Sequence, residues 1–174
     1  MKNATIKILL IEDDKIDQIA FKEVVDTKKL PYDYVIAGSV SETQNLLPSN
    51  RFDVIIADYM LGDGTAFDLF SLIGNLPIIF VTGAGYEDVA AKAMKMGVYD
   101  YLVKDFNRQY LKKLPAVIEK AYQYKSFAQT SKSIKKSKNK VALSEVMESV
   151  VFTQVNLALA LPTDQKRISS QMKI

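Results

Sequence analysis

The sequence of 174 residues contains neither cysteine nor histidine. Without cysteine, the chain has no disulfide framework and no thiolate that could act as a nucleophile or metal ligand, and a cytoplasmic location is expected. Without histidine, it lacks the usual general base and cannot itself carry a phosphohistidine. Any phosphoryl group that this protein accepts would therefore have to be held by an aspartate.

Long apolar runs are also missing. No segment approaches the roughly 20 apolar residues that a membrane-spanning helix needs. The apolar run near the N-terminus stops at Glu12, Asp13 and Asp14. We therefore expect neither a membrane span nor a signal peptide.

The basic residues are concentrated toward the C-terminus. Residues 1–124 hold 14 basic and 17 acidic side chains, whereas residues 125–174 hold 9 and 3. Residues 126–140 contain five lysines, four serines and no acidic residue, a composition that is typical of a linker. We therefore divide the chain into a globular domain (1–125), a basic linker (126–140) and a C-terminal segment (141–174).

The C-terminal segment is expected to be helical in part, because apolar residues recur there at heptad-like spacing. Three roles stay open for it: a dimerising helix, a helix packed against the domain, and a fragment of a larger module. The lysine run from Lys132 to Lys140 has no interleaved aromatic residues and no helix-turn-helix pattern beside it. Nucleic acid is therefore not expected as a partner.

Apolar segments alternate with segments of helical periodicity in residues 1–125, which predicts an α/β fold. The expected strands cover residues 6–11, 34–37, 54–57, 78–81 and 99–103. The expected helices cover residues 15–28, 41–47, 65–73, 86–95 and 108–125. Ser41 and Gln44 resemble a capping box at the second helix, and Pro115 should kink or restart the last one. Such strands should be parallel and buried, with their carboxyl ends at one edge of the sheet.

Side chains suited to phosphoryl chemistry follow four of these strands, in the order Glu12, Asp13 and Asp14, then Asp58, Thr82 and Lys104. A tight group of carboxylates repels itself unless it is protonated or bound to a cation, and oxygen ligands of this kind suit Mg²⁺. A carboxylate can accept a phosphoryl group, and a lysine and a hydroxyl can bind phosphoryl oxygens. The pattern therefore predicts a metal-assisted phosphoryl site with Asp58 as the acceptor.

The sequence closely resembles the receiver domain of two-component response regulators over residues 5–124. The matching blocks are Ile8 to Asp14, Asp58, Val81 to Gly83, and Asp100 to Lys104. The resemblance implies a doubly wound, flavodoxin-like sheet of five parallel strands in the order 2-1-3-4-5, with helices on both faces. It also implies a signalling phosphoacceptor that is not an enzyme, beyond catalysing its own phosphorylation and dephosphorylation.

The roles of individual residues also follow from this resemblance. Asp58 would be the phosphoacceptor, Lys104 the lysine that binds the phosphoryl group, Thr82 the switch hydroxyl and Tyr101 the aromatic switch. The implied ligands of Mg²⁺ are Glu12, Asp13, Asp58 and the backbone carbonyl of Met60. The implied partners are a histidine kinase or histidine phosphotransfer protein as donor, and a downstream protein as target. Homodimerisation stays open.

Two departures from the family pattern and two other functions accompany this interpretation. The helix after Asp58 looks shorter than in many relatives, which affects shape more than chemistry. Asp105 stands where the family usually has a proline after a cis peptide bond. A cis bond before a non-proline residue costs about 3–4 kcal/mol, so the approach of Lys104 to Asp58 is left open. One alternative function is a phosphorylation-independent scaffold or dimerisation module with a receiver fold. The other is an aspartate-nucleophile phosphohydrolase, although Met60 occupies the place where such enzymes carry a second aspartate.

Overall fold

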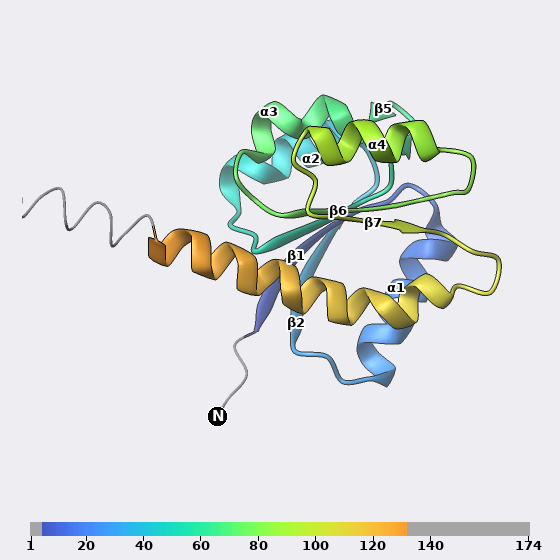
Figure 1. Ribbon diagram of the computed structural model, residues 1–174. Helices are drawn as coiled ribbons and strands as arrows, with labels where there is room; N and C mark the ends of the chain where they lie inside the picture. The colour runs from blue at the N-terminus through green and yellow to red at the C-terminus, as the bar shows by residue number, and fades with distance from the viewer. Residues whose placement is uncertain (1–4, 132–174) are drawn as a thin grey trace, which may run out of the picture. The chain divides into compact units, whose positions relative to one another are not determined.

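A five-stranded parallel sheet forms the centre of the compact unit Met1–Ala128 in the computed structural model (Figure 1). The structure describes residues 5–131, without the side chain of Glu87. The strands are β1 (Ile6–Ile11), β2 (Tyr32–Ala37), β3 (Val54–Ala57), β6 (Ile78–Thr82) and β7 (Asp100–Val103). Their order in the sheet is β2-β1-β3-β6-β7, and all neighbours pair in parallel. The predicted α/β fold and the implied strand order are confirmed.

Helices cover both faces of the sheet (Figure 1). One face carries α1 (Lys15–Thr27) and a helix of residues 109–131, which we call the 109–131 helix. The opposite face carries α2 (Val40–Leu46), α3 (Phe70–Ile73) and α4 (Glu87–Lys95), with the short helices η1 (Leu47–Ser49) and η2 (Ala66–Leu69). A small antiparallel pair, β4 (Met60–Leu61) and β5 (Gly64–Thr65), follows β3. No helix among residues 5–131 is long and apolar enough to span a membrane.

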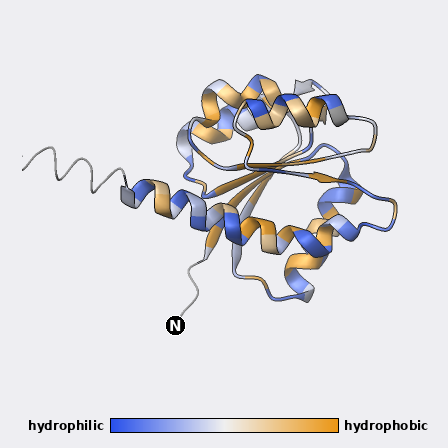
Figure 2. Ribbon diagram, in the orientation of Figure 1, coloured by the Kyte–Doolittle hydropathy of each residue, from blue (hydrophilic) through white to orange (hydrophobic). Residues whose placement is uncertain are grey.

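The side chains of each strand alternate between two buried clusters, one on each face of the sheet. Ile8 and Leu10 of β1 pack with α1 and the 109–131 helix, whereas Leu9 and Ile11 pack with α2, α3 and α4. Figure 2 shows strands that are hydrophobic along their length between helices that have one hydrophobic and one hydrophilic side. Burial on both faces explains why the strands are continuous apolar runs in the sequence.

The start of α2 differs from the prediction because a distant residue defines it. Ser39, and not Ser41, is the N-cap, and its hydroxyl accepts a hydrogen bond from Glu42 N at 3.0 Å. The next two backbone N–H groups, of Val40 and Ser41, donate to the carboxylate of Asp63 at 2.7 and 2.9 Å. These contacts with Asp63, across 23 and 22 residues of sequence, fix where the helix begins. The predicted capping box of Ser41 and Gln44 is therefore wrong.

The 109–131 helix is longer than the predicted helix of residues 108–125. It continues through Pro115 without a break and includes the first six residues of the predicted linker. The buried residues Leu111, Leu114 and Ile118 hold it against the sheet. The rest of the linker and the C-terminal segment lie outside the described residues, so the predicted division of the chain stays a prediction.

Candidate functional site

The sheet presents several of the predicted site residues at its carboxyl edge. Hydrogen bonds between neighbouring strands continue beyond β1 and β3, because Glu12 N donates to Ala37 O and Asp58 N donates to Ile11 O, both at 2.9 Å. On the other side, Lys104 N donates to Thr82 O at 2.8 Å. The backbones of Glu12, Asp58 and Lys104 are therefore fixed by the sheet itself.

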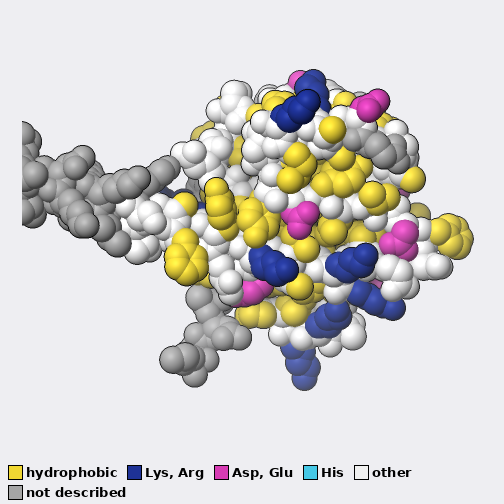
Figure 3. Space-filling model, viewed as in Figure 1, with side chains coloured by type: hydrophobic (Ala, Val, Ile, Leu, Met, Phe, Trp, Pro, Cys, Tyr) yellow, Lys and Arg dark blue, Asp and Glu magenta, His cyan; other side chains and the backbone are white. Residues whose placement is uncertain are grey.

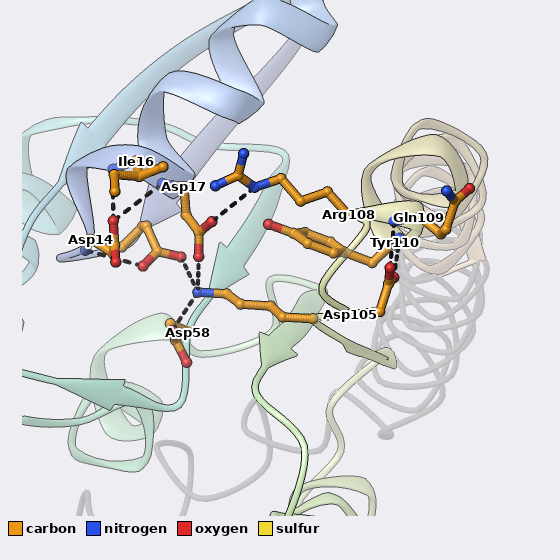
Figure 4. A network of polar contacts seen from close by, with 10 residues as sticks. Asp14, Ile16, Asp17, Asp58, Asp105, Arg108, Gln109 and Tyr110 are labelled. Carbon is orange, nitrogen blue, oxygen red and sulfur yellow. Dashed lines mark hydrogen bonds and ion pairs between the residues drawn. The ribbon is translucent and has the colours of Figure 1, made fainter.

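Lys104 lies at the centre of a network of carboxylates (Figure 4). Its Nζ donates to Asp58 Oδ2 at 2.6 Å and to Glu12 Oε2 at 2.7 Å, so the structure brings together side chains that follow three different strands. It also contacts Asp17 Oδ2 at 2.9 Å. The Lys104 side chain is only 15% exposed, which keeps these charge-assisted contacts partly shielded from water.

Three of the predicted metal ligands form one oxygen-rich group. Glu12, Asp13 and Asp58 each place a carboxylate oxygen within 4.8 Å of the others. One lysine cannot balance three carboxylates, and a divalent cation with oxygen preference would. The donor set therefore fits Mg²⁺.

Burial and the lysine shift the ionisation of the site. Burial raises the pKa of Glu12 to about 7, although the hydrogen bond from Lys104 lowers it. For Lys104, burial alone lowers the pKa, but hydrogen bonds to Asp58, Glu12 and Asp17 outweigh it and hold the pKa above its usual range. The lysine is therefore charged at neutral pH, whereas Glu12 is close to its titration point.

The other predicted residues lie on β6, β7, β4 and at the start of α1. Thr82 is the buried last residue of β6, and Tyr101 is a half-buried residue of β7 that packs against the cluster below α3 and α4. Met60 is the first residue of β4, where pairing with Thr65 fixes the backbone two residues beyond Asp58. Asp14 caps α1 by accepting from Ile16 N at 2.7 Å and Asp17 N at 3.4 Å.

The sequence interpretation missed two charged residues of this network. Asp17 in the first turn of α1 contacts Lys104, and Arg108 Nε lies 3.6 Å from the other oxygen of Asp17. A signal was present, since Asp17 follows the Asp14 cap by three residues, and Arg108 follows Lys104 by four. Both residues lie in the segments that directly follow the carboxyl ends of β1 and β7.

Asp105, which departs from the family pattern, has a structural role here. The peptide bonds of residues 5–131 are all trans, including the one before Asp105. Its carboxylate accepts from Gln109 N and Tyr110 N, both at 3.0 Å, at the start of the 109–131 helix. Lys104 thus contacts Asp58 although the peptide bond that follows it is trans.

The model of the response regulator receiver domain family matches residues 8–115. The chain belongs to this family. Methanogenesis regulatory protein FilR1 of Methanothrix harundinacea is 38% identical over 121 residues, which are 66% of this chain and 27% of that protein. The non-phosphorylated HemR receiver domain from Leptospira biflexa is 31% identical with a TM-score of 0.57, covering 66% of this chain and 94% of that one. A receiver domain from Clostridium thermocellum is 26% identical with a TM-score of 0.62, covering 71% and 98%.

The match identifies a receiver domain of two-component systems, as the sequence blocks implied. Receiver domains are in general signalling phosphoacceptors, bind Mg²⁺ at an acidic pocket, and interact with histidine kinases and downstream effectors. This chain spans 27% of FilR1 and 16% and 25% of two other curated relatives. The similarity therefore identifies the receiver domain, but it does not identify the downstream partner on which this chain acts.

Proposed function

We propose that this receiver domain is a signalling switch in which Asp58 accepts a phosphoryl group from a phosphohistidine of a histidine kinase or phosphotransfer protein. The observation that carries the proposal is the 2.6 Å contact between Lys104 Nζ and Asp58 Oδ2 beside Glu12 and Asp13. A lysine so close to the acceptor can shift onto a phosphoryl oxygen as charge develops. Because residues 1–174 contain no histidine, the donor phosphohistidine would lie outside this sequence.

The chemistry requires positioning more than acid-base groups. In the transfer, an Asp58 oxygen bonds to phosphorus while the P–N bond of phosphohistidine breaks, and the imidazole leaves. In the later hydrolysis, water bonds to phosphorus, the bond to Asp58 breaks, and the carboxylate, phosphate and a proton result. Glu12, Asp13, Asp58 and the Met60 carbonyl would hold Mg²⁺, which would neutralise charge between the acceptor and the phosphoryl oxygens. Lys104 and the Thr82 hydroxyl would each bind a phosphoryl oxygen.

Thr82 and Tyr101 are proposed as the switch residues. Lys104 N donates to Thr82 O, and Tyr101 is opposite Phe80 in the pairing of β6 with β7. A movement of Thr82 toward the phosphoryl group would therefore be transmitted to β7 and to the loop before α4. Such a movement biases a two-state equilibrium of the surface above these elements.

The proposed output surface consists of Ala90 and Met94 of α4, Tyr101, and residues 112–120. Figure 3 shows hydrophobic side chains gathered between α4 and the 109–131 helix, with Lys and Arg side chains on either side. Met94 is 50% exposed. An exposed apolar patch with a charged border suits a downstream protein partner or a second copy of the domain.

The test is intact-mass measurement after incubation with Mg²⁺ and phosphoramidate or acetyl phosphate. Wild type should gain the mass of one phosphoryl group and Asp58→Asn should gain none. Asp14→Asn is the matched control, because it removes a neighbouring charge and keeps an N-cap residue; it should gain the mass. No gain in wild type, or a gain in Asp58→Asn, would contradict the proposal.

Hydrogen exchange, measured on the phosphorylated protein, tests the proposed switch. Phosphorylation should change protection in β6, β7 and α4. Tyr101→Ala should still be phosphorylated but lose the change at α4, and an identical change in this variant would remove Tyr101 from the pathway. If wild type takes up no phosphoryl group, the phosphorylation-independent scaffold becomes the better account.

The cytoplasmic location stays a prediction.

A further inference from the structure

Lys104 has a third carboxylate partner that the phosphoacceptor chemistry does not require. An ammonium group has three N–H donors, and here its three carboxylate neighbours are Asp58 at 2.6 Å, Glu12 at 2.7 Å and Asp17 at 2.9 Å. Asp17 comes from α1, whereas Asp58 follows β3, so the lysine contacts carboxylates from both elements. Asp17 and Asp58 also line the same cavity of about 10 Å³. Asp17, with a side chain that is 19% exposed, therefore borders the same partly buried space as the acceptor.

Asp17 has a second cation, which the loop after β7 supplies. Arg108 Nε is 3.6 Å from Asp17 Oδ1, while Lys104 contacts Oδ2. Arg108 has a positive φ of 52°, a left-handed backbone that non-glycine residues rarely adopt. Its N–H donates to Asp105 O at 2.9 Å. The loop is therefore held in a turn that delivers the guanidinium to Asp17.

We propose that Asp17 is a positioning residue that holds Lys104 back from an incoming phosphoryl group, and that Arg108 weakens this hold by sharing the Asp17 carboxylate. The inference rests on the proposed phosphorylation of Asp58. To engage the phosphoryl group, Lys104 has to exchange carboxylate contacts for phosphoryl oxygens. Every carboxylate that attracts its Nζ in the unphosphorylated protein adds to the cost of that exchange.

The geometry predicts opposite effects for the two residues. Asp17→Asn keeps the shape and an acceptor oxygen but removes the charge, so Lys104 should shift more easily and phosphorylation should be faster. Arg108→Gln leaves Asp17 with Lys104 as its cation in the network, so phosphorylation should be slower. Hydrolysis should change little in either variant, because Lys104 already binds the phosphoryl group in both the phosphorylated state and its transition state.

The experiment measures the phosphorylation rate of the full chain by intact mass, with phosphoramidate and Mg²⁺. In this reaction an Asp58 oxygen bonds to phosphorus as the P–N bond breaks and ammonia leaves. We expect Asp17→Asn to be about twofold to fivefold faster than wild type and Arg108→Gln to be slower by a similar factor. Hydrolysis is measured separately after the donor is removed. Asp17→Glu should return the rate toward wild type.

Two comparisons distinguish a positioning role of Asp17 from a general effect of charge on the rate and from an effect on folding. Glu23→Gln removes the same charge from an exposed position of α1 and should leave the rate unchanged. In the double variant Asp17→Asn/Arg108→Gln, the slowing by Arg108→Gln should disappear, because the carboxylate through which it acts is gone. Arg108 is 45% exposed on its side chain, so its replacement tests the inference even if Asp17→Asn is poorly folded.

The outcomes distinguish this inference from the proposed function. No phosphoryl gain in wild type overturns the proposed function. A gain in wild type with an unchanged or slower rate in Asp17→Asn overturns only the role of Asp17. An equal acceleration by Glu23→Gln, or additive effects in the double variant, would likewise overturn it.

Discussion

Glu12, Asp13 and Asp58, the acidic group of the site, carry more negative charge than Lys104 can balance. Their oxygens lie within 4.8 Å of one another, and Lys104 contacts two of the three residues. Carboxylates at such distances raise the free energy of the folded state unless a cation shields them. The unbalanced charge at this edge favours a bound divalent ion, and the effect can be measured without any phosphoryl donor.

Mg²⁺ is expected to stabilise the folded protein through Asp13. At an ion concentration one hundred times the dissociation constant, the gain in the free energy of unfolding would be about 2.7 kcal/mol. Asp13→Asn should remove most of this gain, because its exposed carboxylate is one of the proposed ligands. The measurement is urea denaturation with and without Mg²⁺. Asp14→Asn, the matched control, should keep the gain; an equal Mg²⁺ effect in Asp13→Asn and wild type would exclude Asp13 as a ligand.

At the scale of elements, the start of the 109–131 helix depends on one aspartate. Asp105 accepts hydrogen bonds from the N–H groups of Gln109 and Tyr110, which have no partner within the helix. The bonds from Gln109, Tyr110 and Asn107 hold the pKa of Asp105 below its ordinary value. Its stabilising effect is therefore present at neutral pH and is lost as the pH falls through the lowered pKa.

Asp105→Ala is expected to lower the thermal midpoint by a few degrees at neutral pH, because two N–H groups lose their acceptor. The difference from wild type should shrink in acid, where Asp105 is protonated in both the folded and the unfolded state. Thermal denaturation followed by circular dichroism at several pH values measures both effects. Asp33→Ala, the same change at an exposed strand position, should shift the midpoint much less. Equal shifts would show that the cap contributes nothing.

A lysine attaches the same helix to the opposite edge of the sheet. Lys125 Nζ donates to Phe52 O and Asp53 Oδ1, both at 2.8 Å, just before β3. Lys125→Met removes both bonds but keeps the apolar stem, so the free energy of unfolding should fall by about 1–2 kcal/mol. Urea denaturation measures the change. Lys120→Met, at an exposed position of the helix, is the control, and an equal loss there would contradict the assignment.

At the scale of the whole molecule, packing in the cluster beneath α1 and the 109–131 helix raises the pKa of Tyr110 and Tyr32. Tyr110 is buried in this cluster and Tyr32 packs against it from β2. Burial raises the pKa of each to about 12, from an ordinary value of 10.0. The folded state therefore holds these protons more tightly than the unfolded state does. The stabilising contribution is complete below pH 10 and is lost as the pH rises toward 12.

The free energy of unfolding should accordingly fall between pH 10 and pH 12. Tyr110→Phe keeps the ring in the core but removes the ionisable hydroxyl, so the fall should become shallower by about 1–2 kcal/mol over this range. Denaturation by urea at a series of pH values measures the slope. Tyr124→Phe changes a tyrosine that is 61% exposed and should leave the slope as in wild type. The same slope in Tyr110→Phe and wild type would contradict the assignment to Tyr110.

The sequence by itself determined the sheet and the group of residues at its carboxyl edge. Continuous apolar runs joined by segments of helical period are typical of parallel strands buried on both faces, and parallel strands end at one edge. This physical constraint places Glu12, Asp58, Thr82 and Lys104 near one another without any knowledge of their contacts. The family resemblance added the order of the strands, which the structure confirms.

Only the tertiary structure decided which of these side chains meet and where several elements begin or end. The start of α2 depends on hydrogen bonds to Asp63, which is 22 or 23 residues away. Lys104 donates to Glu12, from which 92 residues of sequence separate it. The addition of Asp17 and Arg108 to the network, and the extension of the last helix through residue 131, have the same origin. Periodicity and caps report interactions between neighbours along the chain. Contacts between distant residues depend on how the helices pack on the sheet, which local patterns do not contain.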